Sequence, residues 1–173
     1  REVMEIWRER EAQEPDFPCW AAQESRMTEA QREAFLQAFE EERDRSFVAF
    51  CVLGGLFSEG IDLTRDRLIG AAVVGTGLPM VCTEQELLKE YFEETKGQGF
   101  DYAYQYPGMN KVMQAAGRVI RTMDDRGVIL LLDDRFLRRD YQALFPREWL
   151  PYTAVNRDSV QETLRRFWDG EGL

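Results

Sequence analysis

The sequence predicts an α/β fold in which helices flank a mainly parallel sheet. Apolar runs at 47–53, 68–74 and 127–132 have the length and the aliphatic or aromatic content of buried strands. Helix-like segments separate these runs, and strands that alternate with helices favour parallel pairing. With 173 residues, the chain is long enough for one domain that buries about 70% of the surface of its unfolded state.

The N-terminal part of the sequence is predicted to contain two helices and two strands. A helix is expected over 2–13, ending before Pro15, and a short apolar strand over 17–22. Thr28 is expected to cap a helix that runs to about Arg43, with Gln31 at the capping-box position. The run at 47–53 is apolar throughout, so we expect both faces of this strand to be buried.

The C-terminal part of the sequence is predicted to contain two further strands and four helices. The strand at 68–74 ends in the turn 75–79, and Thr83 is expected to cap a helix over 84–96. Pro107 precedes a helix that is expected to continue to about Met123. A strand at 127–132 and helices at 135–145 and 159–168 follow, the last of them capped by Ser159.

Four aromatic residues alternate with polar or small residues ahead of the Pro107 helix. They are Phe100, Tyr102, Tyr104 and Tyr106. The alternation favours an extended segment whose rings pack on the protein. The same rings are compatible with a platform for stacking nucleic-acid bases, and the sequence leaves both interpretations open.

The formal net charge of −10 disfavours a free-standing DNA-binding domain, which is normally basic. The charge is uneven, because the segment 111–147 has eight basic and five acidic residues. No apolar run approaches the roughly 20 residues of a membrane helix, and no signal peptide opens the chain. We therefore expect a cytoplasmic protein without a membrane partner, and a piece of a longer chain, since a helix-like pattern begins at once.

The spacing of the cysteines and the absence of histidine exclude several kinds of chemistry. Cys19, Cys51 and Cys82 are widely spaced and fit no zinc or iron–sulfur pattern, so we expect buried free thiols and no metal site. The chain contains no histidine. Histidine metal ligands, Ser-His-Asp catalysis and histidine acid–base catalysis are therefore excluded within these residues.

The segment 114–121 reads Gln-Ala-Ala-Gly-Arg-Val-Ile-Arg. In a helix, Gln114, Arg118 and Arg121 would share one face at spacings i, i+4 and i+7. A solvated arginine face, which is very common, is the structural alternative. Gly117 argues against that alternative, because a mid-helix glycine costs about 1 kcal/mol and is better explained by the close approach of another backbone or a ligand.

The segment 54–62 is a glycine-rich turn directly after the predicted strand 47–53. Ligands of open α/β sheets bind at the carboxyl ends of strands. Glycine permits unusual backbone angles and close approach, and the turn has it at Gly54, Gly55 and Gly60. Its polar side chains, which could bond ribose or steer a catalytic loop, are Ser58, Glu59 and Asp62. The alternative is a plain strand-to-helix connection.

No phosphate-binding Gly-x-x-x-x-Gly-Lys-Ser/Thr loop is present, because none of Lys89, Lys96 and Lys111 lies in such a pattern. The run that ends in Asp133 and Asp134 is similar to a magnesium-binding strand, but without that loop a core strand with a polar end is favoured. The chain is thus predicted to supply arginines to a nucleotide that is held elsewhere.

Two of these stretches carry a family resemblance. Residues 54–63 resemble motif V, and 114–121 resemble motif VI, of superfamily 2 helicases in the DinG/XPD-like branch of iron–sulfur-type DNA helicases. The stretches 66–79, 100–111 and 133–136 resemble the same branch, so the resemblance covers about 25–150. It implies that 1–173 is a helicase C-terminal domain: a three-layer RecA-like lobe that lacks the ATP-binding first lobe.

The resemblance also implies roles for individual residues. Arg118 and Arg121 would be arginine fingers on the γ-phosphate, and Gln114 would contact the phosphate or the attacking water. In the turn, Gly60 and Asp62 would link the nucleotide to the DNA strand, while Ser58 and Glu59 would lie near DNA or the cleft.

The cofactors and partners follow from the same resemblance. ATP with Mg²⁺ would be bound mainly by the first lobe, and an iron–sulfur cluster, where one exists, would belong to that lobe. Single-stranded DNA and the first lobe of the same polypeptide would be the partners, and the isolated chain would be inactive. Two alternatives stay open: a single-strand translocase coupled to a nuclease, and a non-catalytic α/β interaction domain.

Overall fold

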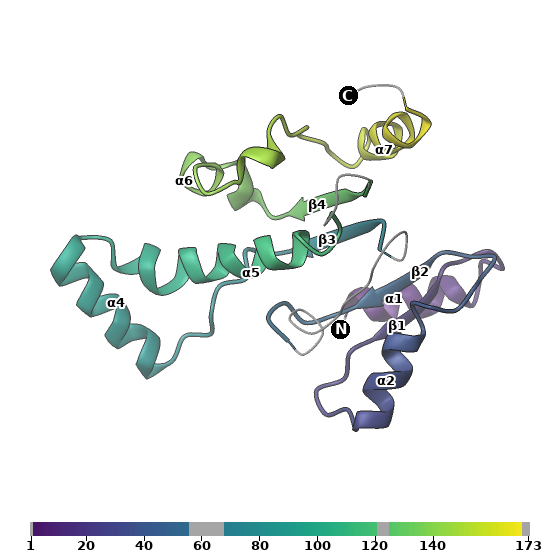
Figure 1. Cartoon of the computed structure of the whole chain (residues 1–173), viewed down its shortest axis with the longest axis horizontal. Helices are drawn as coiled ribbons and strands as arrows, with labels where there is room; N and C mark the ends of the chain where they lie inside the picture. The colour runs from purple at the N-terminus through teal and green to yellow at the C-terminus, as the bar shows by residue number, and fades with distance from the viewer. Residues whose placement is uncertain (1, 56–67, 121–124, 171–173) are drawn as a thin grey trace. The chain divides into compact units, whose positions relative to one another are not determined.

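The computed structural model describes residues 2–55, 68–120 and 125–170 (Figure 1). The chain divides into two units, Arg1–Phe136 and Leu137–Leu173. The first unit contains four described strands, paired in two parallel sheets of two strands each. The predicted α/β class with parallel strands is confirmed, although the described strands do not form one continuous sheet.

The first sheet pairs β1 (Cys19–Ala22) with β2 (Phe47–Phe50), and Cys19 lies opposite Phe47. Helix α1 (Glu2–Glu11) contacts this sheet through Trp7, whose ring lies edge-on to Phe17 and Phe50. Helix α2 (Glu29–Gln37) begins at Thr28 with the predicted capping box, and its buried Phe35 packs against the sheet and its surroundings. The partners of Phe35 are Ala21, Met27, Leu36, Phe39, Ala49 and Leu68.

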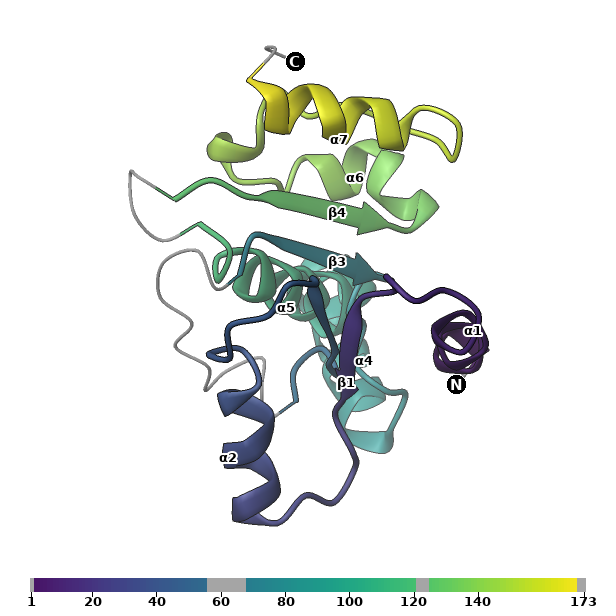
Figure 2. The same cartoon turned by 90° about the vertical axis from the view of Figure 1, so that its right-hand side faces the viewer.

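The second sheet pairs β3 (Gly70–Val74) with β4 (Val128–Leu132), as Figure 2 shows, and Gly70 lies opposite Val128. Helix α5 (Tyr106–Ala116) contacts β3 and buries Met109, Val112 and Ala116. This amphipathic packing fixes α5 against the strand, because three apolar side chains at helical spacing leave the solvent together.

The aromatic segment before α5 is a π-helix, Asp101–Gln105, and the predicted extended conformation is wrong. Phe100 stacks on Tyr104, and Tyr102 stacks on Phe92 of α4 (Thr83–Lys96). The Tyr104 hydroxyl donates a 2.5 Å hydrogen bond to Glu86 Oε1, which raises the pKa of Tyr104 to about 12. Because the stacked rings face one another, the arrangement favours internal packing over a base-stacking platform.

The second unit contains α6 (Arg139–Gln142), a 3₁₀ turn at Arg147–Trp149 and α7 (Val160–Asp169). A further 3₁₀ turn, Asp134–Leu137, precedes α6, so the predicted helix over 135–145 is two short pieces. The ring of Phe145 lies edge-on to Trp149 and Tyr152. Ahead of α7, the Asn156 side chain accepts hydrogen bonds from the N–H groups of Asp158 and Ser159.

Candidate functional site

The carboxyl end of β2 is a tight turn that Gln23 holds in place. The N–H of Gly55 donates to the Val52 carbonyl at 2.9 Å, and the N–H of Val52 donates to Gln23 Oε1 at 3.0 Å. A Cβ on Gly55 would lie 2.9 Å from the Val52 oxygen and 3.0 Å from Gln23 Nε2. Only glycine therefore fits this start of the 54–62 segment.

The loop after β3 lies against both the end of β2 and the start of α5. Gly77 has a φ of 66°, and a Cβ there would lie 2.8 Å from the Gly108 carbonyl oxygen and 2.9 Å from Leu53 Cδ2. A Cβ on Gly108 would in turn lie 2.5 Å from the Thr76 carbonyl oxygen. The backbones of the loop and the helix thus cross in direct contact, which two facing glycines make possible.

Thr76 lies inside this crossing and is only 1% exposed. Within the described structure, its hydroxyl oxygen is buried without a hydrogen-bond partner. A buried hydroxyl that forms no hydrogen bond costs about 1–3 kcal/mol. The contact between the loop and α5 is therefore present in the structure even though the Thr76 hydroxyl, which lies within it, forms no hydrogen bond among the described residues.

One turn further along α5, the side chain of Lys111 lies over the turn after β2. A Cβ on Gly54, which has a φ of 78°, would lie 3.2 Å from Lys111 Cδ and 3.3 Å from Cε. Gly108 and Lys111 are neighbours on one helix face at spacing i, i+3. Through them α5 contacts the segments that follow β2 and β3, which are one strand from each parallel sheet. The carboxyl ends of such strands are where α/β sheets bind ligands.

Gln114 and Arg118 lie at the C-terminal end of α5, where the predicted helix boundary is wrong. The helix ends at Ala116 and does not continue to Met123. A tighter turn follows, in which the N–H groups of Arg118 and Val119 donate to the carbonyls of Ala115 and Ala116. Gln114 is exposed and Arg118 is half-buried, within about one helical turn of each other.

Among the described residues, no other segment makes the close approach of a backbone that we expect at Gly117. It is the C-terminal cap of α5, with its N–H donating to the Met113 carbonyl at 2.8 Å. Among the described atoms, a Cβ on Gly117 would meet carbonyl oxygens of the same helix, those of Met113 and Gln114. Its φ of −65° is a conformation that any residue adopts, so the described structure gives no backbone reason for a glycine at this position.

Five predicted site residues lie outside the described residues. They are Ser58, Glu59, Gly60, Asp62 and Arg121. Of the predicted set, Gln114 and Arg118 are described, and both belong to the segment that follows the strand-end contacts of α5. The roles of all seven residues stay predictions.

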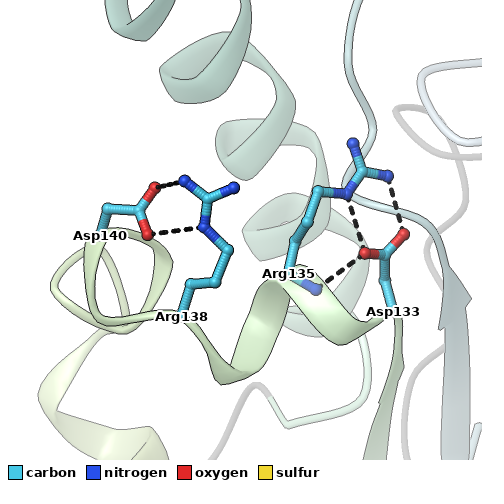
Figure 3. Close-up of polar contacts among 4 residues, drawn as sticks. All are labelled: Asp133, Arg135, Arg138 and Asp140. Carbon is cyan, nitrogen blue, oxygen red and sulfur yellow. Dashed lines mark hydrogen bonds and ion pairs between the residues drawn. The ribbon is translucent and has the colours of Figure 1, made fainter.

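Asp133, at the carboxyl end of β4, is held by Arg135 (Figure 3). The Arg135 side chain donates from Nε to Oδ1 at 2.8 Å and from Nη2 to Oδ2 at 2.7 Å, and its backbone N–H donates to Oδ1. These hydrogen bonds lower the pKa of Asp133 to about 2. Both carboxylate oxygens of Asp133 therefore accept hydrogen bonds from Arg135. Figure 3 also shows the exposed pair of Arg138 and Asp140.

We expect Asp133→Asn to lower stability near neutral pH and to have less effect as the pH falls. The pKa of Asp133 is depressed from 3.8 to about 2 in the folded state, so its contribution is present above about pH 4 and is lost as the pH falls toward 2. Urea unfolding midpoints of wild type and Asp133→Asn, measured between pH 6 and pH 2, should approach each other as the pH falls. Asp140→Asn is the control, because that exposed pair should contribute little. A constant difference across the range would contradict the prediction.

The three cysteines are free, but the expected burial is wrong for two of them. Cys51 and Cys82 are exposed, and Cys19 is half-buried. Neighbouring protein atoms still desolvate the Cys51 sulfur enough to raise its pKa to about 11. A thiol with that pKa is protonated at neutral pH, so Cys51 is no activated nucleophile.

Among the described residues, no three histidine, cysteine or acidic side chains cluster as a metal site would require. No helix in 2–55, 68–120 or 125–170 combines the length and the apolar character needed to cross a membrane.

Sequence reasoning missed the residues that join the strand ends. Gln23, Gly77, Gly108 and Lys111 make contacts between segments that are distant in sequence, and no spacing rule reports these. One signal was available: Lys111 precedes Gln114 by three residues, which places the two side chains on one face of α5.

Comparison with known proteins gives one family and several relatives. Residues 1–152 match the family described as "Helicase C-terminal domain". The chain is 34% identical over 113 residues to "ATP-dependent DNA helicase YoaA" of Escherichia coli, covering 64% of this chain and 17% of that protein. It is 33% identical over 109 residues to the "General transcription and DNA repair factor IIH helicase subunit XPD" of Schizosaccharomyces pombe, covering 61% and 14%.

Two further matches agree with these. The chain is 37% identical over 89 residues to "ATP-dependent DNA helicase DinG" of Photobacterium profundum, covering 50% of this chain and 13% of that protein. A solved structure of an XPD helicase matches 72% of this chain and 22% of its own, with a TM-score of 0.57 and 20% identity, which supports the fold. The chain spans less than a fifth of the length of these curated relatives.

Proposed function

This chain belongs to the helicase C-terminal domain family of DinG- and XPD-like helicases, and from this membership we propose that it is the second motor lobe of an ATP-dependent DNA helicase. The family match carries the proposal, because residues 1–152 include both the glycine-rich segment 54–62 and the segment 114–121. The first lobe, elsewhere in a longer polypeptide, binds ATP with Mg²⁺.

In this proposal, Arg118 and Arg121 act on ATP that the first lobe holds. When the lobes close, the two guanidinium groups reach the γ-phosphate and stabilise the charge that develops during its transfer. Gln114 contacts the phosphate or orients the attacking water. The contacts of α5 with the turn after β2 support this assignment, since they connect the arginine segment to the start of the segment 54–62.

Release of the closed state after hydrolysis drives movement along single-stranded DNA. In this proposal the segment 54–62 transmits the change between the nucleotide and the DNA strand through Gly60 and Asp62, and Ser58 and Glu59 lie near DNA or the cleft. The basic excess of 111–147 supports a contribution of this lobe to phosphate contacts. The net charge of −10 is compatible with DNA binding because the first lobe supplies most of those contacts.

The full-length protein and the chain of residues 1–173 test the proposal together. We expect the full-length protein to hydrolyse ATP faster when single-stranded DNA is added, and the chain alone to show no measurable turnover. Robust turnover by the chain alone, or no response of the full-length protein to DNA, would contradict the proposal. Strand separation on a partial duplex then distinguishes a helicase from a translocase.

A further inference from the structure

The fixed position of the Lys111 side chain is the starting observation. Its last two carbons lie where they would contact a Cβ on Gly54 at 3.2 and 3.3 Å, and the Nζ would be 3.7 Å away. The stem therefore packs on the bare backbone of Gly54, and the ammonium group lies at the turn after β2. Packing of the methylene chain with the charged end left accessible is the usual behaviour of a half-buried lysine.

The ammonium group of Lys111 has no ion pair or hydrogen bond within the part of the chain that the structure describes. Other basic side chains of the same unit are paired with nearby carboxylates, including Arg43 with Glu41 and Lys89 with Glu86. The chain has 32 acidic and 22 basic residues, so partners are abundant. A positive charge that packs against the backbone of Gly54 and has no partner among the described residues is available for an anion from outside.

The position of this charge indicates which anion fits. It lies at the carboxyl end of a parallel strand, where α/β sheets bind ligands. Gln114 follows Lys111 on the same helix at spacing i, i+3. A lysine ammonium is a compact point charge that suits phosphate oxygens.

We propose that Lys111 is a phosphate-binding residue of this lobe, held over Gly54 at the carboxyl end of β2. The proposal rests on the function proposed above and adds a residue to its site. The phosphate belongs either to the backbone of single-stranded DNA or to the nucleotide. Both sources present the same charged oxygens, so the experiment separates them.

The test compares full-length wild type with Lys111→Met, which keeps a stem to pack on Gly54 and removes the charge. Lys111→Arg should restore binding, and Lys89→Met is the control because Lys89 is already paired with Glu86. Fluorescence anisotropy with a labelled oligothymidine at several salt concentrations reports DNA binding. A fluorescent ADP analogue and the KM for ATP report nucleotide binding. Circular dichroism confirms that each variant is folded, and Lys111→Gln replaces Lys111→Met should that variant unfold.

A DNA phosphate at Lys111 predicts weaker oligothymidine binding and a salt slope reduced by about 0.7 in Lys111→Met, with nucleotide binding unchanged. A nucleotide phosphate predicts a KM or analogue Kd that rises roughly tenfold, with DNA binding unchanged. If Lys111→Met bound both the oligothymidine and the nucleotide as tightly as wild type does, the inference would be overturned. If wild type itself showed no DNA-stimulated ATPase, the proposed function would fail instead, so the two failures are distinguishable.

Discussion

Replacing Arg118 or Arg121 by alanine in the full-length protein should lower DNA-stimulated ATP turnover by about three orders of magnitude. Arginine fingers of nucleotide hydrolases contribute about 10³–10⁵ in rate, because the guanidinium neutralises charge that exists only in the transition state. The loss should therefore fall on kcat, while binding of ATP and of single-stranded DNA is retained. Steady-state turnover together with nucleotide and DNA titrations measures the two effects separately.

Two further variants make this prediction specific to the guanidinium group. Lysine at either position keeps the positive charge but lacks the planar fork, so we expect activity to stay far below wild type. Arg157→Ala removes an exposed arginine of the second unit and should leave turnover unchanged. Full activity of Arg118→Ala and Arg121→Ala would show that these arginines are structural, and the proposed mechanism would then be wrong.

The strands were predictable from the sequence because they are short, apolar and bounded by turns. All four predicted runs contain an observed strand, and both pairs are parallel. Their burial was overestimated. Val74 is 77% exposed and Leu132 is 50% exposed, because each described sheet has only two strands and leaves edges and faces uncovered. An apolar run reports the propensity to form a strand and not how many neighbours the strand has.

The aromatic segment shows a limit of periodicity. Residues at every second position also include pairs at i, i+4, so Phe100 with Tyr104 and Tyr102 with Tyr106 satisfy both a strand pattern and a helical one. The structure has the helical solution, as a π-helix that continues into α5. The end of α5 was also missed, because residue 117 was placed within a helix that ends at Ala116.

The candidate site was only partly predictable. Local spacing pointed to Gln114 and Arg118, and the structure places both at the end of α5. The contacts that anchor this helix, from Gly108 to the loop after β3 and from Lys111 to Gly54, join residues that are 31 and 57 positions apart. Such contacts depend on the arrangement of strands, and a single sequence contains no local signal for them.

Gly77→Ala should destabilise the fold by about 2–5 kcal/mol, the largest effect on stability expected here. Alanine in the left-handed region costs about 1–2 kcal/mol, and an overpacked core costs about 1–3 kcal/mol more. Both apply, because Gly77 has a φ of 66° and a Cβ would lie 2.8 Å from the Gly108 carbonyl oxygen. The neighbouring atom belongs to the backbone of α5 and cannot rotate away.

Gly75→Ala separates the two costs within the same loop. Gly75 has a φ of 83°, but a Cβ there would have no atom within 4 Å, so only the conformational cost remains. Since 1 kcal/mol shifts the melting temperature by about 2–4 °C at this size, thermal unfolding should place Gly77→Ala clearly below Gly75→Ala. Equal losses for the two variants would mean that the contact between Gly77 and Gly108 is not a constraint. A confirmed difference would show that the contact between the loop and the start of α5 is a constraint on the helix that contains Lys111 and Gln114.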